Sequence, residues 1–443
     1  MTAEVCVAAM SLGAAPVRPA TAWIEERRSG RRTSVDAWDE WLAPNGRAGV
    51  LTRRVQLQGL QPRAREPIDL YIDGTLAASA VVTTLPDRLP TVGEKPFTIM
   101  LGSCFCAAED RAGRAGRRFA TLPGGLTPDM KLLSGDQVYL DAPFYQFIAR
   151  RNSQSLAETF LRRYYDTWTQ SGDEQGYRQV LASGATFFTA DDHEFWNNAP
   201  FPSSFSTSTW TSGGRKAWWD LAAGLFRALQ SPGPSAVQQI DVGKLSVFVA
   251  DTRMTRSADR KTFLDPAGMQ QLEAWCAGLT FPGLLLVGQP IFAKSSGWRG
   301  RIADWNLPDF EQYRQLCKVL LDAPQPIVIL TGDVHYGRVS QVHTAAGHEL
   351  LEIIASPMSL VTAGGAREWK APPPTFPDEA MPGIVQRPIE ALASWQRAAD
   401  HFLTLEVWQE GGRLGLRART WETAPGAGTP GAPVFAHFLQ RRM

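Results

Sequence analysis

The sequence has no apolar run that approaches the roughly 20 residues needed to span a bilayer. It has only five cysteines, and such an odd, scattered set does not fit a disulfide framework, so a reducing compartment is favoured. Residues 1–16 are apolar but lack the basic stretch that opens a signal peptide. We therefore expect a cytoplasmic protein that does not span a membrane, or a secreted one if a signal was removed.

The chain also lacks an excess of charge of either sign. Lys and Arg number 45 against 44 Asp and Glu, so the net charge is +1 and no basic field for nucleic acid is evident. With 44% hydrophobic and 20% charged residues, the composition excludes a disordered chain, a collagen-like repeat and a coiled coil. Fifteen tryptophans indicate aromatic cores or an aromatic-walled cleft. The composition does not define an oligomeric state.

The first part of the chain is rich in short β-type segments. The strands expected there are Val5–Leu12, Thr21–Glu25, Val50–Gln58, Ile68–Ile72 and Ala77–Thr84. This pattern predicts a small antiparallel β-sandwich of the fibronectin or immunoglobulin type over residues 1–92. Three prolines and a glycine in residues 85–96 mark a boundary, and we expect a second domain over residues 97–443.

In the second part, apolar runs alternate with helical patterns, which indicates an α/β fold. The runs are Phe97–Leu101, Ala185–Thr189, Leu245–Ala250, Leu284–Val287, Ile327–Leu330 and Leu350–Ile354. One helix should follow Asp265, which can cap it with Pro266 at its first position, and another should start at Asp309. Residues 402–421 read as a closing hairpin, and residues 372–377 and 425–433 as loops.

Polar residues follow these runs and the shorter run Lys131–Leu133. They are Cys104, Asp136, Tyr139, Asp192, His193, Asn198, Arg253, Asp333 and His335. In open α/β sheets, ligands bind beyond the carboxyl ends of the strands. The sequence therefore predicts one site assembled from several strand ends.

The residue types in this set indicate metal ions. Asp333 and His335 are two apart, which puts both side chains on one side of an extended chain. A phenolate or a thiolate forms only where a strong Lewis acid lowers its pKa. An oxygen-rich set with one imidazole fits a trivalent, iron-like ion better than tetrahedral zinc. A carboxylate shared by two ions would give a bimetal site, which suits displacement at phosphorus.

Five of these segments resemble the alkaline phosphatase D family of metallophosphoesterases. They occur in the family's order: GSC (102–104), GDQVYLD (135–141), DDHEFWNN (191–198), DTR (251–253) and TGDVH (331–335). The segments Asp304-Trp305-Asn306 and Ser356-Pro357 also match, and the resemblance covers roughly residues 97–360. Where the family usually has Trp before the paired Asp, this chain has Thr189-Ala190.

The resemblance implies a layered α/β/β/α sandwich that binds Fe3+ and Ca2+ and hydrolyses small-molecule phosphate monoesters or diesters. The residues that match its iron ligands are Cys104, Asp136, Tyr139 and His335. By the same resemblance, Asp136 bridges the metals, and Asp192 and Asp333 face the second ion. His193 matches the general acid or charge stabiliser. For the substrate, Arg253 is a candidate phosphate clamp, and Asn198 a candidate ligand or substrate contact.

Other interpretations of these residues stay open. Residues 191–193 could simply cap a helix, and Cys276 and Cys317 fit plain core positions. Four arginines between residues 111 and 118 indicate a solvated loop, or a loop that attracts an anionic substrate. The alternatives to a phosphatase are a catalytically silent binding protein on the same fold and a phospholipid or nucleotide diesterase. Either Phe201–Arg215 or Gly364–Pro382 could form a lid.

Overall fold

The computed structural model describes residues 1–142, 152–170, 176–231, 233, 235–301, 304–359, 370–397, 399–423 and 433–439. Two sheets form its centre. The six-stranded sheet has the order β10 (Ala185–Thr189), β9 (Met130–Ser134), β8 (Phe97–Gly102), β19 (His401–Glu410), β20 (Arg413–Glu422) and β21 (Pro433–Leu439). The eight-stranded sheet has the order β11 (Val237–Val242), β12 (Leu245–Ala250), β13 (Gly283–Leu286), β14 (Ile327–Thr331), β16 (Glu349–Ile354), β15 (Gly337–His343), β18 (Arg387–Arg397) and β17 (Thr375–Phe376).

Strands that matter for the site are parallel. Strands β8, β9 and β10 run parallel to one another, and so do β12, β13, β14 and β16. Every residue of β8, β9 and β14 is buried, as expected for parallel strands covered on both faces. Aliphatic side chains of both sheets share one core, so the two sheets pack face to face.

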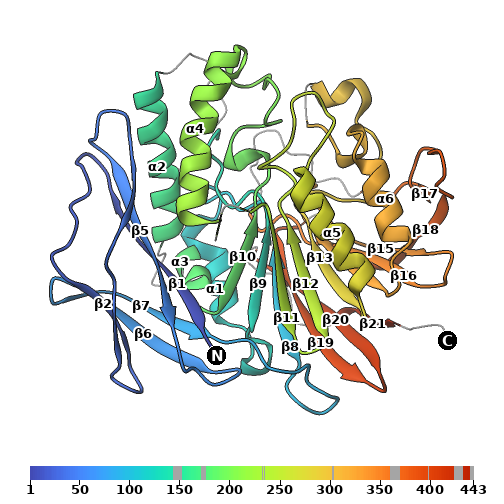
Figure 1. The fold of residues 1–443 in the computed structure, drawn as a ribbon, viewed down its shortest axis with the longest axis horizontal. Helices are drawn as coiled ribbons and strands as arrows, with labels where there is room; N and C mark the ends of the chain where they lie inside the picture. Colours follow the sequence, from blue (N-terminus) through green and yellow to red (C-terminus); the bar gives the residue numbers. More distant parts are fainter. Residues whose placement is uncertain are drawn as a thin grey trace.

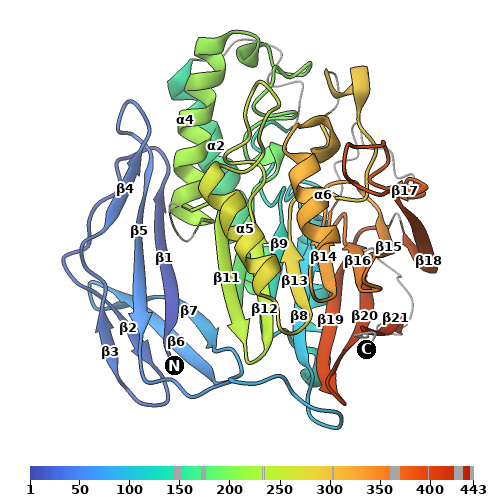
Figure 2. The same ribbon diagram turned by 45° about the vertical axis from the view of Figure 1, so that its right-hand side comes forward.

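Helices cover the outer faces of this double layer. Helices α5 (Pro266–Gly278) and α6 (Tyr313–Leu321) pack on the eight-stranded sheet (Figure 2). Helices α1 (Arg114–Ala120) and α3 (Tyr177–Leu181) pack on the six-stranded sheet. Helices α2 (Ser153–Thr169) and α4 (Ser212–Leu229) stand side by side next to it (Figure 1). The predicted α/β/β/α layering is therefore confirmed.

Residues 3–83 form two small antiparallel sheets. One has the order β1 (Ala3–Ser11), β5 (Gly49–Leu57) and β4 (Asp39–Leu42); the other has β3 (Arg32–Ser34), β2 (Ala22–Glu26), β6 (Arg65–Ile72) and β7 (Thr75–Thr83). Buried side chains of both sheets share a core, so the predicted sandwich is present. A Cβ on Gly224 of α4 would lie 2.7 Å from the ring of Trp41. This glycine lets β4 and β5 of the sandwich lie directly on α4 (Figure 2).

Most local predictions hold, and two need correction. Asp265 caps α5, and β19 and β20 form the expected hairpin. The second helix starts later than predicted: residues 307–309 form a separate 3-10 turn capped by Asn306, and α6 begins at Tyr313. The arginine-rich segment is not a loop, because three of its arginines lie in α1. Most of the predicted loop 425–433, and residues 364–369 of the possible lid Gly364–Pro382, lie outside the described residues.

None of the helices in the described ranges combines the length and the apolarity that a membrane crossing requires.

A buried lysine gives the fold a pH dependence that can be measured. Lys131 of β9 is 1% exposed, and its Nζ donates to the carbonyls of Val180, Ser183 and Gly184. Burial, with a smaller effect of Arg65, lowers its pKa from 10.5 to about 7. Between these two pH values the unfolded chain binds more protons than the folded one. The lysine therefore makes the free energy of unfolding rise with pH, by up to about 1.4 kcal/mol per pH unit.

We predict that Lys131→Met removes this slope. Urea denaturation of both proteins from pH 6.5 to 10 should show that the free energy of unfolding of the wild type rises with pH relative to that of the variant. Lys244→Met changes an exposed lysine. Its free energy of unfolding should depend on pH in the same way as that of the wild type. Parallel curves for Lys131→Met would contradict the lowered pKa.

Candidate metal centre

The predicted site residues follow strands whose ends meet at one edge of the double sheet. Cys104 follows β8, Asp136 follows β9, Asp192 follows β10, and Asp333 follows β14. A Cβ on Gly332, just before Asp333, would overlap the side chain of Ser103, just before Cys104. The end of a strand in one sheet therefore touches the end of a strand in the other.

The backbone at these strand ends is unusual. Five of the predicted site residues have positive φ angles: Cys104 (55°), Asp136 (56°), Asn198 (71°), Asp333 (69°) and His335 (60°). Residues other than glycine rarely adopt this conformation, and strained positions of this kind cluster at functional sites.

Asp136 lies at the centre of the group. Its Oδ2 is 3.6 Å from the Cys104 Sγ and accepts a hydrogen bond from the Tyr139 hydroxyl at 3.4 Å. Its Oδ1 accepts the backbone N–H of His193 at 3.2 Å. Asp136 therefore contacts three other predicted site residues.

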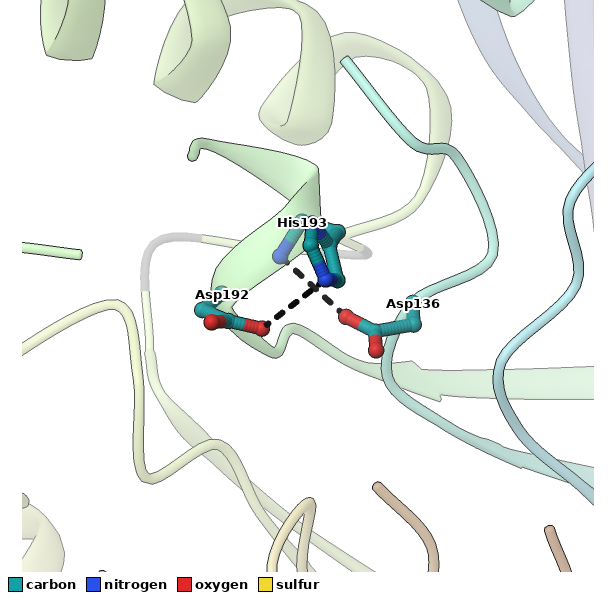
Figure 3. A group of neighbouring side chains, drawn as sticks. All are labelled: Asp136, Asp192 and His193. Carbon is teal, nitrogen blue, oxygen red and sulfur yellow. Dashed lines mark hydrogen bonds and ion pairs between the residues drawn. The ribbon is translucent and has the colours of Figure 1, made fainter. Parts of the chain in front are cut away.

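Asp136, Asp192 and His193 form a group that could hold a metal ion. One potential ligand atom from each lies within 4.8 Å of the others, and all three residues are buried (Figure 3). His193 and Asp192 belong to the 3-10 turn η5 (Asp192–Glu194), and Asp136 comes from the turn after β9 (Figure 3). The Asn198 N–H donates to Asp192 Oδ2 at 2.7 Å. Among the described atoms, the Asn198 Oδ1 is buried and has no hydrogen-bond partner.

Asp333 and His335 join the group from the eight-stranded sheet. The Cys104 thiol donates to the backbone carbonyl of Asp333 at 3.5 Å, and the Asp333 carboxylate accepts from Gln289 Nε2 at 3.2 Å. The His335 N–H donates to Ser356 Oγ at 3.1 Å, and Ser356 Oγ donates to the Cys104 Sγ, also at 3.1 Å. His335 is thus linked to Cys104 through Ser356.

His193 is held by a carboxylate that the sequence analysis did not single out. Its Nδ1 lies 2.7 Å from Asp141 Oδ1, and the second Asp141 oxygen accepts the Asn197 N–H at 2.6 Å. The ring stacks on Tyr139 with centroids 4.3 Å apart. Since a carboxylate only accepts hydrogen bonds, Nδ1 carries a proton. The other ring nitrogen, Nε2, faces the acidic group. It lies 3.9 Å from Asp192 Oδ1.

Arg253 does not have the environment predicted for a phosphate clamp. It is fully buried, and its guanidinium donates to Asp191, to Asp304 and to the carbonyl of Ala199. All three side-chain nitrogens are therefore engaged. A phosphate would have to displace a buried carboxylate to reach Arg253, so this geometry favours a positioning role.

Burial makes the acidic groups of the site hard to ionise. It raises the pKa of the Cys104 thiol to about 12, with a further contribution from the Asp333 carboxylate. It raises the pKa values of Asp136, Tyr139 and Asp333 well above their usual ranges, and that of Asp192 to about 6. For His193, burial opposes the charged ring, but the nearby carboxylates, Asp141 above all, outweigh it and raise the pKa.

This donor set fits metal ions. Thiol, phenol and carboxylate groups lie together in a buried place, and close carboxylates raise one another's pKa values. A multivalent cation reverses that balance, because it favours the ionised form of every ligand. The unpartnered Asn198 Oδ1 is one more oxygen of the kind that hard cations bind.

The structure also adds residues that the sequence analysis gave no role. Asp141, Asp191, Glu194 and Asp304 lie within the quoted motif segments, but their partners are far away in the sequence. Asp141 and His193, for example, are 52 residues apart. The cap interpretation is partly correct, since Asp191 caps η5 together with Glu194. It does so while also accepting from Arg253.

Comparisons with known proteins place the fold. No family model matches the sequence, and no curated protein matches it. The solved structure of PhoD aligns with a TM-score of 0.63 and 16% identity over 95% of this chain and 82% of PhoD. A purple acid phosphatase from yellow lupin (Lupinus luteus) seeds aligns with a TM-score of 0.56 and 11% identity, over 96% and 71% of the two chains. The chain thus has the fold of PhoD and of this purple acid phosphatase, as the resemblance to alkaline phosphatase D predicts.

Proposed function

We propose that this protein hydrolyses phosphate esters with the help of metal ions held at the strand ends. The observation that carries the proposal is the meeting of Cys104, Asp136, Tyr139, Asp192 and Asp333 at one edge of the two sheets. Burial of three carboxylates side by side is costly, since each prefers water or a partner of opposite charge, and a metal ion would be such a partner for them and for the thiol and phenol beside them. The fold shared with two phosphatases supports the same activity.

The proposed ligands divide into two groups, as the family resemblance implies. Cys104, Asp136, Tyr139 and His335 would hold Fe3+, while Asp192 and Asp333, with Asp136 shared, would hold Ca2+ or another divalent ion. When bound, such ions supply Lewis-acid stabilisation of the phosphoryl charge and lower the pKa of a water molecule. The carboxylate and phenol oxygens of the first group are the donors that support a trivalent first ion.

We propose that His193 protonates the leaving alkoxide. Asp141 fixes the ring through Nδ1, so Nε2 is the atom that can pass a proton to the substrate. A charged ring also stabilises the negative charge that develops on the phosphoryl group. In this proposal Asn198 contacts an ion or the substrate, and Arg253 holds the turns through Asp191 and Asp304. The substrate class is a small-molecule phosphate monoester or diester.

The metal-binding part of the proposal predicts a change in thermal stability. Calcium, manganese or iron added to the metal-free protein should stabilise it, by about 2.7 kcal/mol at a concentration 100 times Kd. Asp136→Asn should lose this stabilisation, because Asp136 contacts three other members of the set. The melting temperature with and without each metal is the measurement.

The matched control is Asp220→Asn, at an exposed aspartate of α4. It should keep the stabilisation seen in the wild type. A full metal-induced shift in Asp136→Asn would exclude Asp136 as a ligand.

If His193 is a proton donor and not a metal ligand, its substitution should lower turnover without loss of the metal. His193→Gln should keep its bound metal and lose about 10²–10⁴-fold in kcat on a phosphate ester. Asp141→Asn should lose about 10–100-fold, because it disturbs only the orientation of the ring. Steady-state kinetics on bis(p-nitrophenyl) phosphate and p-nitrophenyl phosphate, with the metal content of each variant, checks both.

Loss of metal from His193→Gln would make His193 a ligand rather than a proton donor. If the metal-loaded wild type hydrolysed neither ester, the alternative of a silent binding protein would replace the proposed function.

A further inference from the structure

One buried carboxylate, that of Glu194, connects the two turns that carry Asp136 and Asp192. Its Oε2 accepts the backbone N–H of Asp136 at 2.8 Å and that of Asp191 at 2.9 Å. Its Oε1 accepts the N–H groups of Gln137 and Val138. Glu194 is fully buried. A single side chain thus satisfies four backbone donors from the turns after β9 and β10.

These turns need such an acceptor. The parallel ladder between β9 and β10 ends at the pair Ser134 and Thr189, so the N–H groups beyond it have no partner in a neighbouring strand. A buried N–H without an acceptor costs about 1–3 kcal/mol. A carboxylate is the side chain with enough acceptor positions for four donors. It also favours the left-handed conformation of Asp136 by holding the N–H of that residue in place.

The carboxylate is itself fixed from behind by two helices. Gln230, which follows α4, donates from its Nε2 to Glu194 Oε1 at 3.3 Å. The hydroxyl of Tyr164 in α2 donates to Gln230 Oε1 at 2.7 Å. Gln230 is 3% exposed and Tyr164 is fully buried. These two hydrogen bonds, from Tyr164 to Gln230 and from Gln230 to Glu194, therefore connect the two turns to the helical layer.

We propose that Glu194 is the positioning residue that sets the separation of Asp136 from Asp192 and His193, and so fixes the metal-binding geometry. This inference rests on the proposed function of the site. Glu194 does not act as a ligand itself, because backbone donors and Gln230 already engage both of its oxygens. The effect is indirect: without the carboxylate, the two turns lose their common acceptor and the candidate ligands move apart.

The test compares Glu194→Gln with a matched control, Asp129→Asn. Asp129 is also a buried carboxylate that accepts a backbone N–H, from Thr98 at 3.0 Å, but it precedes β9 at the end away from the site. Manganese is titrated into each metal-free protein by calorimetry, and amide hydrogen exchange is followed at residues 136, 137 and 191. Urea denaturation without metal reports the loss of general stability.

Glu194→Gln is expected to bind manganese about 10–100-fold more weakly, as outer-shell partners of metal ligands do. Exchange should become faster at the three amides, and kcat at saturating metal should fall with KM little changed. Asp129→Asn should lose stability but keep its manganese affinity. If Glu194→Gln does not fold, Glu194→Asp takes its place with the same expectation, since a side chain shorter by one methylene cannot reach both turns.

Unchanged manganese affinity and unchanged amide exchange in a folded Glu194 variant would overturn the inference. A different result would contradict the proposed function itself. In that case the wild type would bind no metal and hydrolyse no phosphate ester.

Discussion

The structure depends on one electrostatic constraint: several carboxylates are buried at the edge where the two sheets meet. Burial of an unpaired charge costs more than most single interactions in a protein contribute. The buried carboxylates are found in three kinds of surroundings. Arg253 pairs with Asp191 and Asp304, backbone N–H groups surround Glu194, and the remaining acids face one another around Asp136. In the described part of the chain, this last group gathers carboxylates, a thiol and a phenol around Asp136 with His193 as the neighbouring cation, and it is the proposed metal site.

The fold produces this arrangement because parallel strands of both sheets end at the same edge. A glycine at position 332 lets the end of β14 approach the end of β8, and left-handed turns then aim Cys104, Asp136 and Asp333 at a common place. The helical layer continues the support, since Trp218 of α4 donates to the carbonyl of Phe195 just after η5. The N-terminal sandwich, packed on α4, stands behind that helix.

Much of this could be predicted from the sequence, because strand ends are readable from apolar runs and the motifs follow them. The layers, the sandwich and the convergence of Cys104, Asp136 and Asp192 were predictable in this way. Long-range pairing was not: nothing in the local pattern indicates that Asp141 holds His193. The partners of Arg253 were not predictable for the same reason, since an arginine after a strand indicates that it binds an anion but not which anion. Its anions are carboxylates of the chain itself.

If the buried acids at the strand ends hold metal ions, the purified protein should contain them, and its metal content per chain and its visible absorption spectrum measure this. We expect iron with a phenolate-to-iron charge-transfer band, from Tyr139, and a second metal. A colourless protein that stays free of metal after incubation with iron, calcium, manganese and zinc would contradict it.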